Sequence, residues 1–227
     1  MSPDDLPATG SEQAEPVAPA PPAVVFERYG EHAALLVSYA RWLAGPGLER
    51  GLLGPREVPR IWDRHILNSV VLAELLPPSV RLVDIGTGAG LPGLAVACIR
   101  PDLRVDLVES LQRRTDFLSE VVDDLGLTER VRVVRGRAED KAVVSGVGFA
   151  DFVTARAVAP LDRLTRWSVP LLAPGGRLLA LKGSTAEAEV ETHSAALRRL
   201  RVEVLGIREC GIGVVDPPTR VVEVARR

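Results

Sequence analysis

The stretch LVDIGTGAGLPGLAVA joins two apolar segments through a bend in which every second residue is glycine. The glycines at these alternate positions are Gly86, Gly88 and Gly90. Glycine lets the main chain turn sharply and lets a ligand lie close to the backbone. A dinucleotide motif, G-x-G-x-x-G, would need another glycine where Leu91 stands, and a phosphate-binding P-loop would need Lys-Ser or Lys-Thr after the glycines. The pattern therefore predicts a ligand that contacts bare backbone and carries no pyrophosphate.

Two acidic residues are placed to complete such a site. Glu109 follows the glycines by roughly 20 residues, at the end of the next apolar run, where a carboxylate can accept hydrogen bonds from both hydroxyls of a ribose. Asp84 stands just before the glycines and can either order their loop or face an ammonium or sulfonium group. These residues favour an adenosine with a free ribose.

A third segment suits an adenine ring. Ala138 and Glu139 follow the apolar run RVRVVRG. The Glu139 carboxylate can bind an exocyclic amine such as adenine N6, while Ala138 packs on the ring. Asp140 fits either this role or that of an N-cap for a following helix.

Short apolar runs alternate with helical segments through this part of the chain. The predicted strands span residues 80–85, 104–110, 130–136, 150–157, 177–183, 202–210 and 219–226. The predicted helices span residues 91–99, 111–125, 161–172 and 186–200. Alternation of this kind gives a parallel, doubly wound sheet, and the last two strands, with no helix between them, give an antiparallel hairpin. We therefore expect an α/β, Rossmann-like fold with a seven-stranded, mostly parallel sheet and a ligand at its carboxyl edge.

The residues before this sheet divide into two parts. Residues 1–23 are rich in Pro, Ala and acid and contain no base, which predicts a disordered acidic tail. Helical periodicity over residues 26–43 and 58–76 predicts a small helical cap at 24–78, leaving 79–227 as the core.

Composition excludes several classes of protein. The 227 residues are 46% hydrophobic and 26% charged, as is usual for a globular protein. No apolar run approaches the roughly 20 residues of a membrane helix, and we expect neither a signal peptide nor membrane association. Cys98 and Cys210 have no metal-site spacing, so we expect free thiols in the cytoplasm and no metal. The net charge of -2 is too slight to indicate nucleic-acid binding by itself.

The sequence also limits the acceptor of a methyl group, the group that an adenosine carrying a sulfonium would transfer. Methylation of pyrimidine carbon 5 needs a cysteine near the fourth strand, and both cysteines lie elsewhere. Methylation of an exocyclic amine commonly uses Asn/Asp-Pro-Pro-aromatic after that strand, whereas the DPPT at 216–219 lies between the last two strands and reads as a turn. An acceptor that is already nucleophilic, such as guanine N7, needs neither device and no general base.

Several motifs together resemble one family over roughly residues 26–225, namely WDRHILNSVV, VDIGTGAGLPGLAVA, ESLQRRTDFL, GRAED, TARAVAPL and LAPGGRLLALKG. This is the RsmG (GidB) family, whose members are class I methyltransferases that use S-adenosyl-L-methionine to modify guanine N7 in bacterial 16S rRNA. The resemblance implies that fold, cofactor and reaction here, with 16S rRNA or the small ribosomal subunit as partner. The one departure is QRR after Glu109-Ser110-Leu111, where a lysine-arginine pair is usual, and it keeps the positive charge.

The resemblance also implies roles for individual residues. It assigns cofactor contacts to Gly86, Leu91, the Ala138–Glu139 pair and Arg156. It places the segment DRHILNS, with Arg64, His65 and Asn68, and Lys182 near the cleft, facing RNA or the cofactor's tail. We expect Arg156 and Lys182 to orient the reactants, while Arg113, Arg114 and Lys182 are candidates for a phosphate track.

Other interpretations of these residues remain. Arg156 can simply pair with an acid, His65 and Asn68 can be a satisfied core pair, and surface arginines are commonly just solvated. Trp62 and Trp167 are expected to pack in the core. For the whole chain, the alternatives are a small-molecule methyltransferase, whose cap closes over a metabolite, and a non-catalytic, adenosine-ligand-binding ribosome-assembly factor. In each case we expect a monomer.

Overall fold

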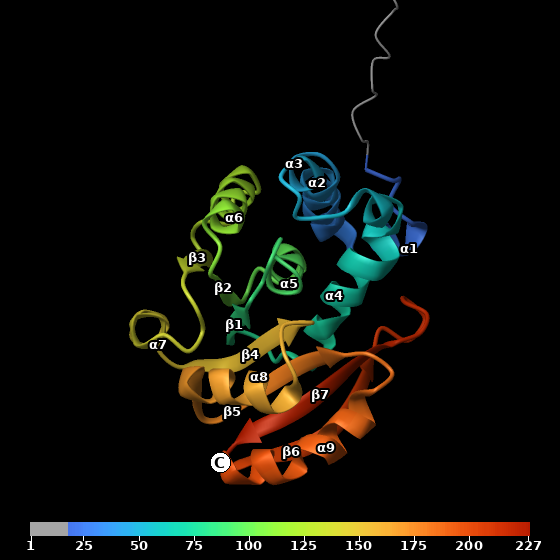
Figure 1. Cartoon of the computed structure of the whole chain (residues 1–227). Coiled ribbons are helices and arrows are strands. Elements are labelled where there is room, and N and C mark those ends of the chain that lie inside the picture. The colour runs from blue at the N-terminus through green and yellow to red at the C-terminus, as the bar shows by residue number, and fades with distance from the viewer. Residues whose placement is uncertain (1–17) are drawn as a thin grey trace, which may run out of the picture.

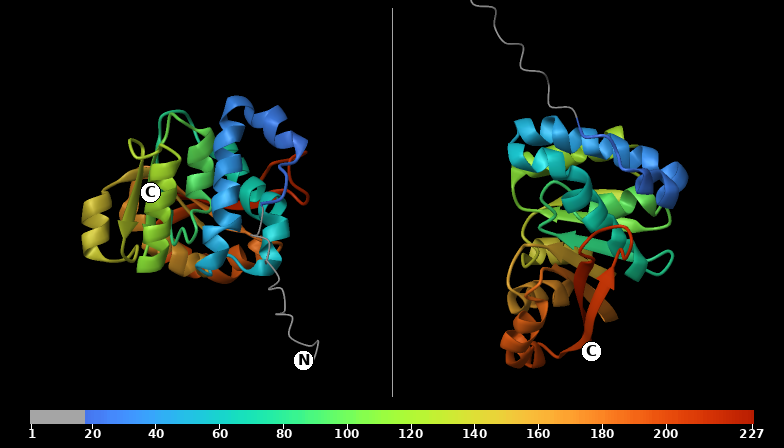
Figure 2. Two further views of the ribbon diagram at one scale, coloured as in Figure 1. Left: turned by 90° about the horizontal axis from the view of Figure 1, so that it is seen from above. Right: turned by 90° about the vertical axis from the view of Figure 1, so that its right-hand side faces the viewer.

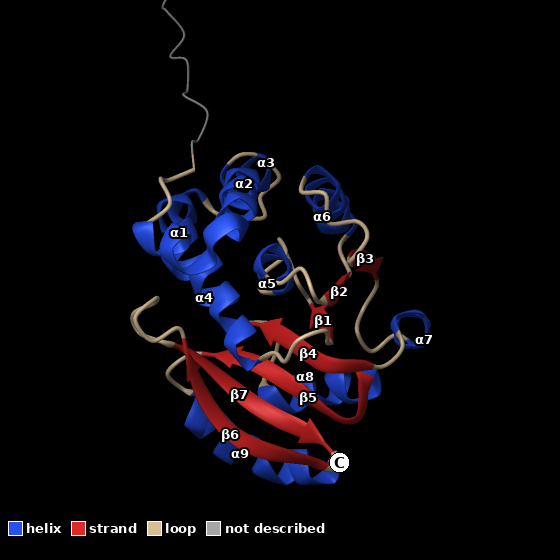
Figure 3. Ribbon diagram, turned by 180° about the vertical axis from the view of Figure 1, so that it is seen from behind, coloured by secondary structure: helices blue, strands red, loops and turns tan. Residues whose placement is uncertain are grey.

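The structure, a computed structural model, describes residues 18–227. One seven-stranded sheet runs through the molecule, in the order β3-β2-β1-β4-β5-β7-β6 (Figures 1 and 3). Its strands are β1 (Arg81–Ile85), β2 (Arg104–Glu109), β3 (Val131–Arg135), β4 (Ala150–Arg156), β5 (Leu172–Lys182), β6 (Val202–Cys210) and β7 (Thr219–Arg226). The first five pair in parallel, and β7 lies antiparallel between β5 and β6. The predicted sheet and its closing hairpin are confirmed.

Helices cover both faces of the sheet, as a doubly wound fold requires. On one face lie α5 (Gly93–Ile99) and α6 (Gln112–Asp124), which share a hydrophobic core with the cap. The other face holds α7 (Lys141–Val147), α8 (Leu161–Ser168) and α9 (Ala186–Arg199) around a second core. β1 is apolar on both sides, so it is buried between the two layers.

The cap consists of short helices that lie beside α5 and α6 (Figure 2). They are α1 (Ala23–Tyr29), α2 (Ala33–Ala44), α3 (Pro46–Glu49), α4 (Asn68–Val70), the 3-10 helices η1 (Gly30–His32), η2 (Pro55–Arg60) and η4 (Val71–Leu75), and the π-helix η3 (Ile61–Leu67). The two long helices predicted here are wrong in their continuity. Gly30, at φ 50°, ends α1, and Pro59, inside η2, disfavours an α-helix there because proline has no N–H to donate.

Other elements also differ from the prediction; for example, α8 ends at Ser168 and the 3-10 helix η5 (Val169–Leu171) follows it. A helix after Asp140 was expected only as one alternative and without bounds, because the sequence of α7, KAVVSGV, mixes β-branched residues with glycine and has no clear helical period. β5 begins at Leu172 instead of residue 177, since the APGG segment continues the strand across an irregular register. In the part of the predicted tail that the structure describes, Trp62 Nε1 donates to the Pro19 carbonyl at 2.8 Å, so the chain packs on the cap there. The rest of the predicted tail, residues 1–17, lies outside the described residues.

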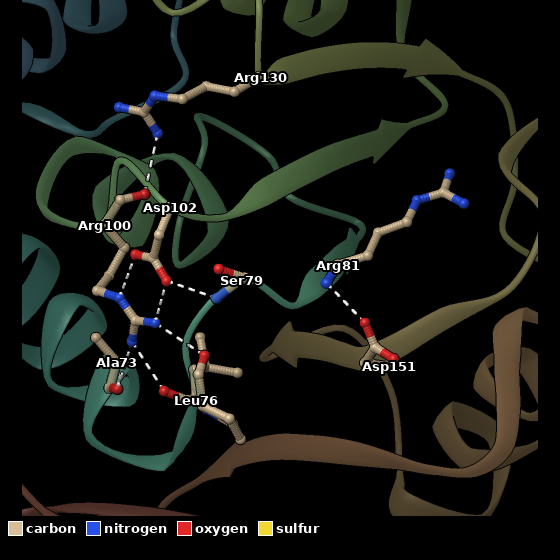
Figure 4. Close-up of polar contacts among 9 residues, drawn as sticks. Ala73, Leu76, Ser79, Arg81, Arg100, Asp102, Arg130 and Asp151 are labelled. Carbon is tan, nitrogen blue, oxygen red and sulfur yellow. Dashed lines mark hydrogen bonds and ion pairs between the residues drawn. The ribbon is translucent and has the colours of Figure 1, made fainter.

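A polar cluster fastens the cap's last helix to the amino end of the sheet (Figure 4). The Arg100 guanidinium donates to the carbonyls of Ala73 and Leu76 and pairs with Asp102 at 2.7 Å. Asp102 in turn accepts from the Ser79 N–H at 2.7 Å, and the Arg100 guanidinium holds the pKa of that carboxyl well below its usual range. These contacts join the end of the cap to the segments that precede β1 and β2.

The opposite edge, at the carboxyl ends of the parallel strands, is where the cap and the hairpin meet. Thr219 Oγ1 donates to Asn68 Oδ1 at 2.8 Å, and the Gly211 N–H donates to Glu74 at 3.0 Å. Cap, sheet and hairpin therefore surround one edge. Within residues 18–227, no helix combines the length and the apolarity that a membrane crossing requires.

Candidate cofactor and substrate site

The glycine loop follows β1 and turns back on itself before α5. Its alternate glycines have φ angles of 64°, 63° and 106° at Gly86, Gly88 and Gly90, all in the region that favours glycine. A Cβ at Gly86 would lie 2.9 Å from Val158, and one at Gly90 would lie 2.8 Å from the Tyr39 hydroxyl. Both backbone conformation and space therefore require glycine here.

Tyr39, on α2 of the cap, is the residue that holds this loop from outside. Its side chain is fully buried, and its hydroxyl donates to the Ala89 carbonyl at 2.8 Å. Its helical spacing marked Tyr39 as a core residue only, and no signal in the sequence identifies the loop as its partner. The cap thus contributes directly to the shape of the loop.

Asp84 orders the loop, which is one of the two roles considered for it. Its Oδ2 atom accepts from Thr87 Oγ1 at 2.6 Å and from the Gly93 N–H at 2.7 Å. The side chain is fully buried, and among the described residues Oδ1 has no hydrogen-bond partner. Burial raises the pKa of Asp84 to about 7. This carboxyl therefore changes its charge near neutral pH.

The raised pKa of Asp84 predicts that the folded protein becomes less stable as pH rises. The folded pKa exceeds the ordinary value of 3.8, so between these pH values the folded chain binds a proton that the unfolded chain lacks. The free energy of unfolding should fall as pH rises through this window, by up to about 4 kcal/mol. Asp84→Asn removes the titration, so urea unfolding at pH 5 and pH 8 should show a smaller difference for the variant than for the wild type. Equal pH dependence in the two proteins would contradict this assignment.

Glu109, the last residue of β2, joins the loop through its carboxylate. The residue is only 3% exposed, and its Oε2 atom accepts a hydrogen bond from the Gly88 N–H at 3.0 Å. Oε1 accepts from the N–H groups of Ser110 and Leu111 at 2.8 and 3.0 Å. Arg114 approaches Oε2 at 3.4 Å. The structure therefore brings together Glu109 and the glycine loop, the two elements that sequence analysis paired.

Two pockets lie on either side of Gly86. The first is lined by Ile85, Gly86, Val108, Ser110, Gly136, Arg137, Ala138, Glu139, Val158 and Trp167. The second is lined by Leu52, Leu53, His65, the loop residues 86–89, Leu91, Glu109, Ser110, Arg114 and residues 156–158. Both linings include Gly86, Ser110 and Val158, so the two pockets are adjacent.

The first pocket has a cavity volume of about 280 Å³ and a mostly apolar wall. Ala138 is buried in this wall and Glu139 is exposed at its rim, an arrangement that suits a flat ring with one polar edge. Trp167, on α8, also lines it, although we expected this residue only to pack in the core. Asp140 precedes α7 and accepts from the Arg137 N–H at 3.1 Å, so it closes the turn beside the pocket.

Arg156, at the end of β4, lies in the second pocket without a carboxylate partner among residues 18–227. Its guanidinium donates to the Arg64 carbonyl at 3.1 Å and contacts His65 Nδ1 at 3.3 Å, and both are neutral acceptors. Burial lowers the pKa of this guanidinium, so an anion placed beside it would be stabilised. The interpretation of Arg156 as one half of an ion pair is not supported.

Only some of the residues predicted to contact RNA line the pockets. His65 and Arg114 line the second pocket, while Arg64 and Arg113 are exposed on neighbouring surfaces. Asn68 instead binds Thr219 at the base of the hairpin, outside both linings. Among the described residues, no three His, Cys, Asp or Glu side chains gather as a metal site would require.

Lys182 is engaged inside the fold. Its Nζ donates to the Ala159 carbonyl at 2.9 Å and to Glu189 Oε1 at 2.7 Å, and its side chain is 11% exposed. It lies outside both linings and fastens the segment that follows Arg156.

Comparisons with known proteins show the fold and the family of this chain. Solved structures with the same fold include the mitomycin 7-O-methyltransferase MmcR, at 19% identity and a TM-score of 0.56 over 90% of this chain and 75% of that one. A methyltransferase from Pyrococcus furiosus matches at 17% identity and a TM-score of 0.54, over 69% of this chain and 80% of its own. At these identities the likeness shows the fold alone.

Sequence relatives are much closer. The ribosomal RNA small subunit methyltransferase G of Salinispora arenicola is 54% identical over 202 residues, covering 87% of this chain and 83% of its own. The protein of the same name from Mycolicibacterium smegmatis is 52% identical over 209 residues, covering 92% and 88%. The family model for GidB, rRNA small subunit methyltransferase G, matches residues 32–215. This chain belongs to the GidB family of rRNA small subunit methyltransferases.

Proposed function

We propose that this protein transfers a methyl group from S-adenosyl-L-methionine to N7 of a guanine in 16S rRNA. Its relatives named ribosomal RNA small subunit methyltransferase G support the reaction and the RNA. The observation that carries the choice of acceptor is the chemistry of the two pocket linings. Cys98 and Cys210 lie outside both linings, so neither offers a cysteine nucleophile. This disfavours pyrimidine carbon 5, and the DPPT segment at 216–219 also lies outside both linings, which disfavours an exocyclic amine. We therefore choose guanine N7, an acceptor that is nucleophilic by itself.

We expect the cofactor to lie across the two adjacent pockets in one orientation. Its adenine would occupy the first pocket, between Ala138 and Trp167, with the exocyclic amine near Glu139. Its ribose hydroxyls would bind the Glu109 carboxylate, and its methionine part would follow the glycine loop into the second pocket. When bound, the cofactor supplies an activated methyl group on a sulfonium.

The protein's part in this reaction is alignment. Guanine N7 presents a free lone pair, so no group has to remove a proton before the methyl transfer. An unpaired base would enter the second pocket, and catalysis would come from holding N7 and the methyl in line. Arg156 would bind an anionic group there, either the methionine carboxylate or an RNA phosphate. Lys182 would act indirectly, because it holds the segment that follows Arg156.

Exposed arginines around the second pocket would bind the RNA backbone. Arg64 and Arg114 stand at or beside its lining, and Arg113 is exposed next to Arg114 on α6. Contacts of this kind release counterions, so substrate binding should weaken steeply as salt rises. A metabolite bound under the cap would show little of this dependence.

We place the reaction in the cytoplasm and expect a monomer, which light scattering can check.

The test is methylation of ribosomal material with cofactor labelled on its methyl group. The protein is incubated with small ribosomal subunits and with naked 16S rRNA, and strand scission selective for N7-methylguanine then locates the product. We expect label at a single guanine in one of these substrates. Label only in small molecules would favour a metabolite methyltransferase, and cofactor binding without any transfer would favour an assembly factor.

A further inference from the structure

A hydrogen-bonded chain connects the cap to the second pocket through Glu57, His65 and Arg156. Glu57 Oε2 lies 2.8 Å from His65 Nε2, and His65 Nδ1 lies 3.3 Å from an Arg156 amino group. Glu57 belongs to η2, His65 to η3 and Arg156 to the end of β4. Two consecutive helices of the cap and the end of a strand about ninety residues further along the chain thus meet at one imidazole.

The partners of this imidazole determine its tautomer. A guanidinium can only donate hydrogen bonds, so Nδ1 of His65 must be the acceptor toward Arg156. The proton of the neutral ring then lies on Nε2, where it is donated to the Glu57 carboxylate. Burial lowers the pKa of His65, and the charge of Arg156 acts in the same direction, so the ring is neutral near pH 7 as this arrangement requires.

The protein shields both Glu57 and His65 from water, so water competes little with the hydrogen bond between them. The side chains of His65 and Glu57 are 11% and 28% exposed. Arg64 also pairs with Glu57, at 3.2 Å, and its carbonyl accepts from Arg156. A carboxylate behind an imidazole fixes both the tautomer and the orientation of the ring.

We propose that Glu57 is a positioning residue: it holds His65 as the Nε2–H tautomer, whose Nδ1 lone pair directs the Arg156 guanidinium into the second pocket. Neither the family match nor the comparisons assign a role to Glu57. The consequence for catalysis rests on the proposed function, because it assumes that Arg156 binds a reactant. The structural part, the tautomer of His65, does not depend on that assumption.

The test compares Glu57→Ala with Glu57→Gln, a conservative variant that keeps an acceptor oxygen at the same position. Glu120→Ala is the matched control, since Glu120 also joins the cap to the core, through Arg50 at 2.6 Å, but contacts no histidine. The tautomer is read from the ¹⁵N chemical shifts of His65, which is one of only three histidines and is assigned with a His65→Gln sample. The kcat/KM for rRNA methylation is measured alongside.

We expect the wild type, Glu57→Gln and Glu120→Ala to show the Nε2–H tautomer. Glu57→Ala removes the shorter of the two contacts that select the tautomer and leaves only the Arg156 contact at 3.3 Å. This variant should therefore give a mixture of tautomers and lower kcat/KM by about tenfold. An Nδ1–H tautomer in the wild type would overturn the proposal, as would an unchanged tautomer or an unchanged kcat/KM in Glu57→Ala. Equal losses of kcat/KM in Glu57→Ala and Glu57→Gln, with the tautomer intact, would assign Glu57 a structural role instead and also overturn it.

Failure of the proposed function gives a different result. If the wild type does not methylate rRNA, the function is wrong, while the shifts of His65 still report whether Glu57 sets its tautomer. If Glu57→Ala does not fold, the wild-type tautomer and Glu57→Gln still decide the structural part.

Discussion

Replacing Arg156 by alanine is expected to lower the rate of rRNA methylation at least about a hundredfold while the fold persists. The guanidinium carries a charge with no carboxylate partner in the described chain, and it faces the pocket that would hold the reacting groups. Two charge-assisted hydrogen bonds to an anionic reactant would be lost with it. The fold should tolerate the change, because Arg156 donates only to neutral acceptors beside an open pocket.

Arg156→Lys separates charge from geometry. Lysine keeps the positive charge but lacks the planar fork of donors, so we expect an intermediate rate. Arg163→Ala is the matched control, since Arg163 is exposed on α8 and outside both linings. Single-turnover rates on small subunits, together with thermal unfolding midpoints, check all three variants. Wild-type turnover in Arg156→Ala would remove this residue from the reaction.

Replacing Glu109 by glutamine is expected to weaken binding of S-adenosylhomocysteine about a hundredfold. The Glu109 carboxylate lies against the Gly88 N–H at 3.0 Å, at the boundary of the two pockets. The glutamine side chain has the same shape, but it replaces one carboxylate oxygen with an NH₂ group, which donates where the ribose needs an acceptor. The remaining oxygen is neutral, so its hydrogen bond to a ribose hydroxyl is weaker than that of a carboxylate.

Asp106→Asn is the control for Glu109→Gln. Asp106 is a buried carboxylate on the same strand, β2, but it pairs with Arg81 and Arg132 away from the glycine loop. Its loss should lower stability and leave cofactor affinity unchanged. Titration calorimetry distinguishes the two effects, and a Glu109→Gln protein that binds like the wild type would exclude Glu109 from the ribose site.

The sheet could be predicted because its strands are short apolar runs separated by glycine, proline and helical segments. The contact between Glu109 and the glycine loop could also be predicted. The parallel strands β1 and β2 have their carboxyl ends at the same edge of the sheet, and this brings Glu109 to the loop. The cap was harder, because proline and glycine interrupt its helices without changing the apolar spacing that indicates helix. α7 mixes β-branched residues with glycine and shows no clear helical period, whereas α5, which has the same length, is an apolar segment.

Residues that act through tertiary contacts left little trace in the sequence. Tyr39 and Trp167 fit the spacing of core residues, and nothing local distinguishes a core wall from a pocket wall. Lys182 carries a charge that suggested RNA, but its partner Glu189 becomes its neighbour only when β5 and α9 pack together. Glu57 left no signal, because its contact with His65 depends on the direct junction of the 3-10 helix η2 with the π-helix η3.

The most direct measurement is a crystal structure of the protein with S-adenosylhomocysteine. We predict that the ribose hydroxyls lie within hydrogen-bonding distance of Glu109, with adenine beside Ala138 and Trp167 and the homocysteine along residues 86–89 toward Arg156. A nucleoside bound elsewhere, or one whose ribose does not touch Glu109, would contradict this account of how the chain holds its cofactor.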